Sequence, residues 1–359
     1  MTLYVTLFVT LLILREWVAV EARPGGAANR LTTLAIGSFL AVLTAIRVDT
    51  GTDFPTYEAI WDYTNTLPEL TIDETFFHLL EPLFVLTTSA LKSMEPEPWI
   101  FFVVYGIATI ALLHQSIVWF RLNGPHAYLV YTGVFLLPYA FNGMRQALTM
   151  SIFLYALRHI LRRRTSHVVL WTTVAAGFHL TGILIGLAYV VHRLTEHREF
   201  PVGRWFFWGA LLSGFVGLAG LGGRLFFLLF EYKAETYSEL FNEGSSITNI
   251  AVRVILSALL IYGASMGSPS RLLRQLLVMY SLGLFLYLTL SEFNVLATRF
   301  NMFFRVLEVI LVPMVLVKIR GSRNIALHGV ITALMFVALV TVASSPDYDY
   351  QSTIVRLLF

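Results

Sequence analysis

Cysteine is absent from the 359 residues of the chain. Its absence excludes disulfides, thiolate-bound metals, cysteine nucleophiles and iron–sulfur clusters. Charge is also scarce, because only 13% of the residues are charged, against about 25% in a typical soluble domain. The net charge of +3 is not gathered into a basic patch with interleaved aromatics, so we do not expect a nucleic acid as partner.

Several chemical signatures are missing as well. The sequence contains no Walker-type phosphate loop, no glycine-rich dinucleotide fingerprint, no His-x-x-x-His metal pair and no Gly-x-Ser-x-Gly nucleophile elbow. We therefore expect neither a metal nor a cofactor. The first apolar run, residues 2–14, lacks the basic start and the cleavage site of a signal peptide, and we interpret it as a first membrane span.

Hydrophobic residues dominate instead and make up 57% of the chain. They form many runs that approach the length of about 20 residues needed to cross a bilayer. The pattern predicts an all-α integral membrane protein of the cell membrane, with residues 1–359 in a single transmembrane domain. We expect a helical bundle of about 12 spans, within a range of roughly 10–14. The candidate spans are residues 2–20, 31–46, 99–120, 127–141, 145–161, 167–178, 180–192, 205–221, 246–265, 273–290, 299–318 and 324–343.

Lysines and arginines in short loops predict which loops face the cytoplasm. These loops are residues 158–164, 193–204 and 318–323, with a weaker fourth at Arg271 and Arg274. The first two can share one side only if residues 167–192 cross the membrane twice and turn near His179. The alternative is a single helix of 26 residues, which would place the second basic loop outside.

Several segments then fall on the extracytoplasmic side. Residues 47–97 form an extracytoplasmic loop whose apolar part, 76–92, is expected to re-enter the membrane without crossing it. Residues 222–245 are expected to form an amphipathic helix that lies at the membrane surface. The tail, residues 344–359, belongs to the same side.

The stretch from Arg47 to Tyr57 combines an arginine, carboxylates, a glycine and a tyrosine directly after a span. Ionisable groups at membrane depth are costly and are therefore candidates for function. Gly51 permits backbone geometry closed to other residues, Pro55 suits the first turn of a helix, and Asp53 is placed to accept amide hydrogen bonds there. An ordinary polar loop with a helix cap would explain the same residues.

A second candidate is the Asn142-Gly143 break between two spans. Arg145 and Gln146 follow it in the first turn of the next helix. Amides at a helix N-terminus attract anions, and an arginine binds phosphate through two parallel hydrogen bonds. Because the positive end of a helix disfavours an arginine, we expect an anionic ligand there. The alternative is an interfacial arginine on lipid phosphates.

Further ionisable side chains stand out. His179 is a lone histidine between two apolar runs, either a structural group or a catalyst. Arg299 lies near the outer end of its span, where it meets a ligand or snorkels to the surface. Glu308 is placed to pair with Arg305. Glu81 precedes a proline in the re-entrant segment, where a broken helix can line a cavity.

The order of these motifs resembles the EpsG family of Wzy-like polysaccharide polymerases. The resemblance covers residues 40–310 and rests on five motifs in the right order. The matching residues are Arg47, Gly51, Asp53, Phe54 and Tyr57; Glu81 and Pro82; Phe141, Asn142, Arg145 and Gln146; Phe178, His179 and Thr181; and Arg299, Phe303 and Phe304. Phe54 stands where tyrosine is usual, Thr181 replaces a serine, and the late segment lacks its usual tyrosine.

The resemblance implies a glycosyltransferase on the outer face of the membrane. It would join oligosaccharide repeat units, carried on a polyprenyl pyrophosphate, into an exopolysaccharide, capsule, O-antigen or related glycan. Donor and acceptor are both lipid-linked repeat units, and the lipid pyrophosphate is the leaving group. A flippase and chain-length regulator proteins are expected partners, besides membrane lipids.

This chemistry assigns roles to the candidate residues. Arginines stabilise the departing pyrophosphate without a metal, with Arg145 as first choice and Arg299 and Arg47 in support. A general base takes the proton of the acceptor hydroxyl, and His179 is slightly preferred over Asp53 because histidine titrates near neutral pH. Direct displacement inverts the anomeric carbon. The expected substrate-binding set also includes Gln146, Asn142, Tyr57 and Glu81. Sugar stacking is expected on Tyr57, Trp61, Tyr63 and Tyr237.

Three other functions agree with parts of the sequence. Broken helices and intramembrane arginines also mark transporters and flippases, although no repeat symmetry is visible and the charged residues gather on one side. An outer-face acyltransferase would use a histidine too, but no route for an acyl donor is visible. A purely structural subunit would tolerate the loss of Arg145 and His179.

Overall fold

The computed structural model describes residues 1–21, 26–70, 80–196, 201–222, 224, 228, 245–266, 269–318 and 322–352. The regular secondary structure of these residues is helical apart from a small two-stranded sheet, which confirms the all-α class. The chain forms two compact units. The first comprises Met1–Leu187 and His328–Phe359, and the second comprises Ala188–Leu327. The single domain stays a prediction.

Several helices are long and apolar enough to cross a membrane. Among the described residues there are five, or six if one bent pair counts as a span. The five are Ala27–Ala45, Trp99–Trp119, Ile247–Ser265, Arg271–Thr289 and Ile325–Ala343. Shorter apolar helices cover Leu180–Thr195 and Val202–Leu218. The chain is therefore a multi-pass membrane protein, while a total of twelve spans stays a prediction.

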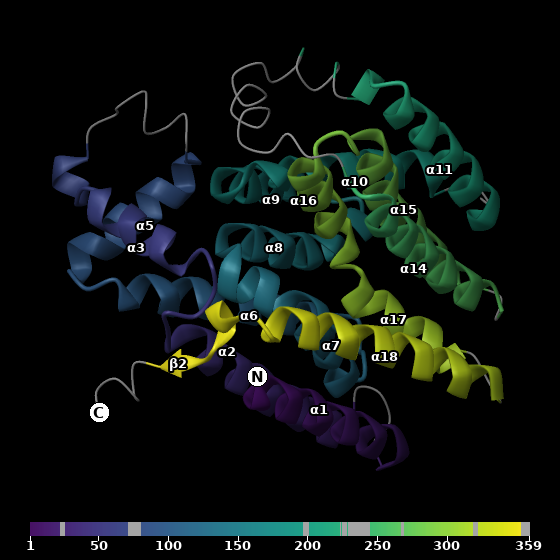
Figure 1. Cartoon of the computed structure of the whole chain (residues 1–359), viewed down its shortest axis with the longest axis horizontal. Coiled ribbons are helices and arrows are strands. Elements are labelled where there is room, and N and C mark those ends of the chain that lie inside the picture. Colours follow the sequence, from purple (N-terminus) through teal and green to yellow (C-terminus); the bar gives the residue numbers. More distant parts are fainter. Residues whose placement is uncertain are drawn as a thin grey trace. The chain divides into compact units, whose positions relative to one another are not determined.

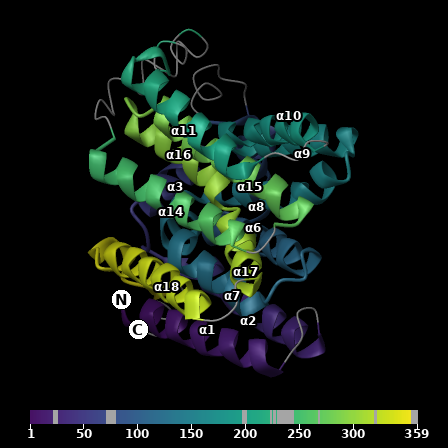
Figure 2. The same cartoon turned by 90° about the vertical axis from the view of Figure 1, so that its right-hand side faces the viewer.

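Helices distant in sequence pack together in the first unit. α1 (Thr2–Glu21) lies beside α18 (Ser322–Ala343), and the Phe8 and Phe336 rings are 5.5 Å apart (Figures 1 and 2). α2 (Ala27–Ala45) packs against α6 (Trp99–Trp119), which also packs on α8 (Met144–Leu161). The buried faces of these helices carry leucine, phenylalanine and tyrosine, so apolar burial holds the unit together.

An aromatic cluster joins α6 to two short helices, α3 (Phe54–Tyr63) and α5 (Pro82–Met94). Phe101 of α6 contacts both of them, with ring centroids 5.8 Å from Tyr57 and 5.8 Å from Phe84. Aromatic pairs at such separations add to the stability gained from burial.

Trp61 is 1% exposed and donates its indole N–H to a backbone carbonyl, so its expected sugar-stacking role is wrong. The remaining short helix here is η1 (Leu67–Glu69).

The predicted helix break at Asn142-Gly143 is confirmed. α7 (Gly124–Tyr131) continues into η2 (Thr132–Asn142), a wide π-type helix that contains Pro138. Gly143 then leaves the helical conformation, and α8 begins at Met144. Wide π-type turns inside helices occur frequently at functional sites.

The predicted turn at His179 is also confirmed. α9 (Thr165–Phe178) ends there, followed by η3 (Leu180–Ile183) and α10 (Leu184–Thr195). A Cβ on Gly182 would collide with the backbone of Ala175, and one on Gly186 would lie 3.7 Å from Thr172. The chain therefore folds back along α9, and a single helix over residues 167–192 is wrong.

The second unit contains α11 (Val202–Leu218), α14 (Ile247–Ser265), α15 (Arg271–Thr289), α16 (Asn294–Arg305) and α17 (Glu308–Lys318). α14 and α15 lie side by side (Figure 1). The predicted span over residues 299–318 falls on α16 and α17, a pair bent by 47° that forms either one broken span or a re-entrant loop.

The bend in the second unit carries the predicted ion pair. Glu308 starts α17, where a carboxylate suits the positive helix end. Its Oε1 is 2.6 Å from Arg305 Nε and accepts a hydrogen bond of 2.9 Å from Tyr280.

The amphipathic helix expected over residues 222–245 falls almost entirely outside the described residues, as do residues 71–79 of the expected outer loop.

Candidate functional site

The loop after α2 is held between two other parts of the first unit. On one side β1 (Arg47–Val48) pairs antiparallel with β2 (Gln351–Ser352). On the other side Gly51, with a φ of +103°, lies against the end of η2. A Cβ on Gly51 would be 2.6 Å from the carbonyl oxygen of Phe141, so the predicted need for glycine is confirmed.

Gly51→Ala is expected to lower the free energy of unfolding by about 1–3 kcal/mol, because it combines a strained backbone with a backbone clash. The measurement is the melting temperature of the purified protein in detergent, together with its activity. Gly214→Ala in α11 is the control, because an added Cβ there meets nothing within 4 Å. Equal melting temperatures for the two variants would contradict the expectation.

Asn142 connects this loop to the helix break. Its Oδ1 accepts hydrogen bonds from the Thr52 hydroxyl, at 2.8 Å, and from the backbone N–H of Asp53, at 2.7 Å. Pro55 lies in the first turn of α3 as predicted. The capping role predicted for the Asp53 side chain is wrong, since it makes no capping hydrogen bond.

The backbone explains why Asp53 does not cap α3. Capping residues usually have extended backbone geometry, but Asp53 has φ −89° and ψ −2°. Pro55 also supplies no N–H to accept in the first turn. Asp53 is half-buried, and its carboxylate does not cap the helix.

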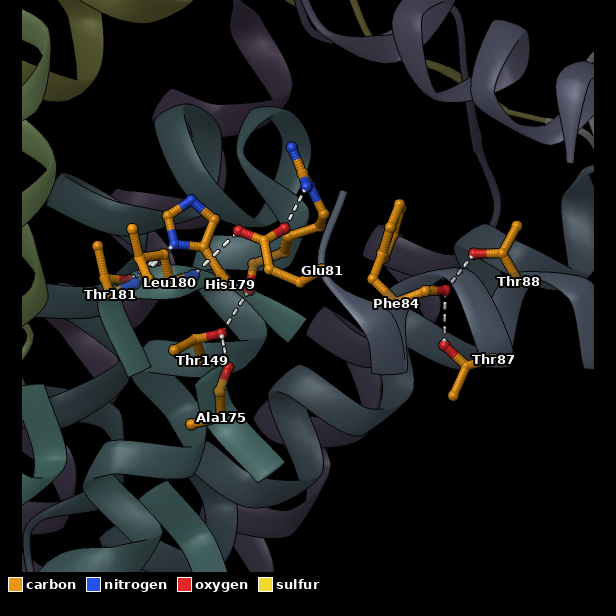
Figure 3. Close-up of polar contacts among 10 residues, drawn as sticks. Glu81, Phe84, Thr87, Thr88, Thr149, Ala175, His179, Leu180 and Thr181 are labelled. Carbon is orange, nitrogen blue, oxygen red and sulfur yellow. Dashed lines mark hydrogen bonds and ion pairs between the residues drawn. The ribbon is translucent and has the colours of Figure 1, made fainter. Parts of the chain in front are cut away.

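Glu81 and Arg145 form the centre of the site. Arg145 lies in the first turn of α8 as predicted, and its Nη1 is 2.6 Å from Glu81 Oε2. The other oxygen of Glu81 accepts the backbone N–H of Leu180 at 3.0 Å (Figure 3). One carboxylate thus joins the start of α5, the start of α8 and the turn after α9. The Arg145 guanidinium also lies over the Phe84 ring, 5.0 Å from its centroid.

Tyr57 brings α3 to the same arginine. Its side chain is 5% exposed, and burial raises the pKa of its phenol, whereas the adjacent Arg145, which hydrogen-bonds to it, lowers that pKa. The negative charge of Asp53 acts on the same phenol and raises its pKa. The tyrosine is therefore a neutral link between Arg145 and the Asp53 end of α3.

His179 lies at the turn that contributes Leu180. Its Nδ1 accepts the backbone N–H of Thr181 at 3.2 Å and is 2.8 Å from the Thr181 hydroxyl (Figure 3). Because an amide can only donate, Nδ1 must carry a lone pair, and in the neutral ring the proton is assigned to Nε2. This ring presents Nε2–H as a hydrogen-bond donor.

Arg47 lies inside the first unit and is 1% exposed. Its guanidinium donates to the carbonyl of Thr44 and contacts the rings of Phe102 and Phe141, at 5.1 and 5.3 Å from their centroids. Burial lowers its pKa to about 10, which leaves it protonated at neutral pH. These contacts tie the loop to α6 and η2. Gln146 is also buried, at 4% exposure.

Two groups were missed in the sequence. Thr52 binds Asn142, and only the fold reveals that contact. Arg253 of α14, in the second unit, donates to Asn301 and lies 4.4 Å from the centroid of the Tyr287 ring. An arginine inside a candidate span was a signal for it. The predicted Arg299 is half-buried on α16 of the second unit.

Fold and site together define a class: a multi-pass helical membrane protein in which four segments of the first unit converge on one arginine–carboxylate pair. The chain belongs to the EpsG family, which it matches over residues 30–353. Membership implies a role in polysaccharide biosynthesis. Neither the curated proteins nor the solved structures contain a match to it.

Proposed function

We propose that the protein is a membrane glycosyltransferase that polymerises lipid-pyrophosphate-linked oligosaccharide repeat units on the extracytoplasmic face of the cell membrane. The observation that carries this proposal is the Arg145–Glu81 pair, which connects three motif segments and lies beside His179. A donor and an acceptor, both lipid-linked, are the proposed substrates. A flippase would supply them, and a chain-length regulator would act on the product.

Arg145 is proposed to bind the departing pyrophosphate. Its guanidinium stands at the N-terminus of α8, where backbone amides and the helix dipole also favour an anion. The Glu81 carboxylate, 2.6 Å from Arg145 Nη1, supports the proposal that this guanidinium binds an oxyanion. Arg299, on α16 of the second unit, stays a predicted pyrophosphate-binding residue. Arg47 is proposed to act through the loop that it holds, because its guanidinium is buried among aromatic rings.

Asp53 is the proposed general base. Its carboxylate does not cap α3, whereas the His179 lone pair at Nδ1 is occupied by the Thr181 amide. His179 is instead proposed to donate a hydrogen bond from Nε2 to the pyrophosphate or a sugar oxygen. The sequence analysis slightly preferred His179 as the general base. The proposal instead assigns the base to Asp53 and hydrogen-bond donation to His179.

The proposed reaction is a single displacement at the anomeric carbon. The acceptor hydroxyl oxygen forms a bond to that carbon, and its proton passes to the Asp53 carboxylate. The bond from the anomeric carbon to the pyrophosphate oxygen breaks, and the electron pair leaves with the lipid pyrophosphate. Attack opposite to the leaving group inverts the anomeric configuration. The arginines supply the positive charge that stabilises the leaving group, so the proposal requires no metal.

An in vitro assay tests the function. Purified protein in nanodiscs receives lipid-pyrophosphate-linked repeat units of its source cell, with EDTA and without ATP, and products are separated on a gel. We expect a polymer ladder from the wild type. The absence of a ladder would contradict polymerisation and favour transport of the same lipid-linked substrate.

The same assay separates the two roles of His179. Glutamine places an N–H donor near the position of Nε2, so His179→Gln is expected to keep about a tenth of the wild-type rate, consistent with loss of part of one hydrogen bond. His179→Ala is expected to lose roughly 10²-fold. A glutamine variant as inactive as the alanine variant would instead support a base at His179.

A further inference from the structure

The side-chain oxygen of Asn142 lies against three successive residues of the loop that leads into α3. It accepts the hydroxyl of Thr52 at 2.8 Å and the backbone N–H of Asp53 at 2.7 Å. A Cβ added to Gly51 would lie 3.4 Å from the same oxygen. The loop therefore passes close to one atom of the η2 end just before the residue that the proposed reaction uses as its base.

The partners of Asn142 fix the orientation of its amide group. A backbone N–H can only donate, so the atom beside the Asp53 N–H must be Oδ1 and not Nδ2. The second lone pair of Oδ1 accepts the Thr52 hydroxyl. Both lone pairs are then used within the protein, and this oxygen is committed to the loop.

The position of Asn142 is set by the packing of the residue before it. Phe141 is fully buried, and its ring centroid lies 6.2 Å from that of Tyr4 and 6.1 Å from that of Tyr350. The Arg47 guanidinium lies 5.3 Å from the centroid of the same ring. These contacts hold the end of η2 without using the Asn142 side chain, so Asn142 is a firm anchor for the loop.

The same anchor lies three residues before Arg145. Gly143 separates η2 from α8, and Arg145 follows in the first turn of α8, where it pairs with Glu81. The short stretch of backbone sets the distance from Asn142 to Arg145, and the hydrogen bonds of Oδ1 set the distance from Asn142 to the Asp53 backbone.

We propose that Asn142 is a positioning residue, which holds the Asp53 backbone in a fixed place relative to Arg145 and does not itself bind the substrate. The inference rests on the proposed function for its kinetic consequence. In the proposed displacement, Asp53 takes the acceptor proton and Arg145 binds the leaving pyrophosphate, on opposite sides of the anomeric carbon. The rate then depends on how accurately the two groups are placed relative to each other.

Asn142→Ala removes the oxygen that accepts both hydrogen bonds. We expect kcat to fall about tenfold while the KM for the repeat unit changes by no more than about twofold, because a reacting group is misplaced and no binding group is lost. We also expect amide hydrogen exchange of residues 51–54 to become about tenfold faster, since the Asp53 N–H loses its acceptor. The exchange measurement needs no activity.

Asn142→Asp separates positioning from substrate binding. Aspartate is nearly isosteric and keeps an acceptor oxygen for the loop, but it loses the N–H donors. We therefore expect slow exchange of residues 51–54, as in the wild type, and a kcat within about threefold of wild type at the variant's own pH optimum. The added negative charge disfavours an ionised base nearby, so the acidic limb of the kcat/KM profile should move to higher pH, by about one unit.

Asn29→Ala is the matched control, because Asn29 is a buried asparagine of the first unit whose Oδ1 also accepts a backbone N–H, that of Gly124, at 3.0 Å. It should lower the melting temperature and speed exchange near Gly124. It should leave kcat and the exchange of residues 51–54 unchanged.

The outcomes separate this inference from the proposed function. Wild-type kcat and wild-type exchange in Asn142→Ala would overturn the positioning role. So would an Asn142→Asp variant as slow as the alanine variant with a raised KM, which would indicate that the amide N–H groups bind substrate. If the alanine variant does not fold, faster exchange of residues 51–54 in Asn142→Asp overturns the role, and wild-type exchange with a shifted acidic limb supports it. If the wild type forms no polymer, the proposed function fails, and exchange in the two variants still decides whether Asn142 holds the loop.

Discussion

Arg145→Ala is expected to lower the rate of polymer formation by roughly 10²–10³-fold, the range observed when a preorganised donor to a developing oxyanion is removed. The pyrophosphate gains charge as the glycosidic bond breaks, and this arginine is its proposed partner. Arg145→Lys is expected to fall between wild type and alanine, because lysine keeps the charge but loses the planar pair of donors. Rates come from the gel assay at saturating repeat unit.

The control for this prediction must separate chemistry from folding. Arg145→Ala leaves the Glu81 carboxylate, which is 12% exposed, without its ion-pair partner, and a partly buried charge destabilises the fold. The double variant Arg145→Ala/Glu81→Gln removes both charges and should recover melting temperature without recovering activity. Arg158→Ala, at the other end of α8, should stay near the wild-type rate. Wild-type polymer formation by the double variant would contradict the role of Arg145.

Asp53→Asn is expected to lower the rate by about 10²–10⁴-fold, the usual contribution of general base catalysis. Asparagine is nearly isosteric with aspartate but accepts no proton at neutral pH. The backbone N–H of Asp53 still donates to Asn142, and no capping bond is lost, so α3 should keep its start. Kinetics and melting temperature are measured on the same preparation.

Asp62→Asn is the matched control, because Asp62 is an exposed carboxylate on the same helix. It should retain the wild-type rate. If Asp53→Asn retains it as well, while His179→Gln is inactive, the base is His179 and the assignment proposed above is reversed. If both variants stay active, neither residue is the base.

Part of the site followed from the sequence because it depends on neighbours in the chain. The Asn142-Gly143 pair between two apolar runs predicted a helix break, and this placed Arg145 in a first helical turn. The turn at His179 followed from the charges of two loops, since both can face one side only if the chain reverses between them. The Arg305–Glu308 pair was predicted from the spacing of three residues on one helix, but in the structure the pair lies across the bend between α16 and α17.

Other parts depended on packing between distant residues. The motif predicted that Arg47 binds the ligand, but its guanidinium packs between the rings of Phe102 and Phe141. Trp61 was expected to face a sugar and is instead buried against α6. Both errors have one cause. A polar or aromatic residue beside a membrane span can face a ligand or be buried between helices, and the sequence pattern is the same in both cases.

The sequence by itself determined the class of the protein, the helix breaks at Asn142-Gly143 and at His179, and the identity of the motif residues, because hydrophobic length and turn-forming residues act locally. Only the tertiary structure decided that Glu81 meets Arg145 across 64 residues and that β2 (Gln351–Ser352) pairs with Arg47–Val48 about 300 positions earlier. Such contacts are selected by how whole helices bury their apolar faces, and that selection leaves no local mark in the sequence.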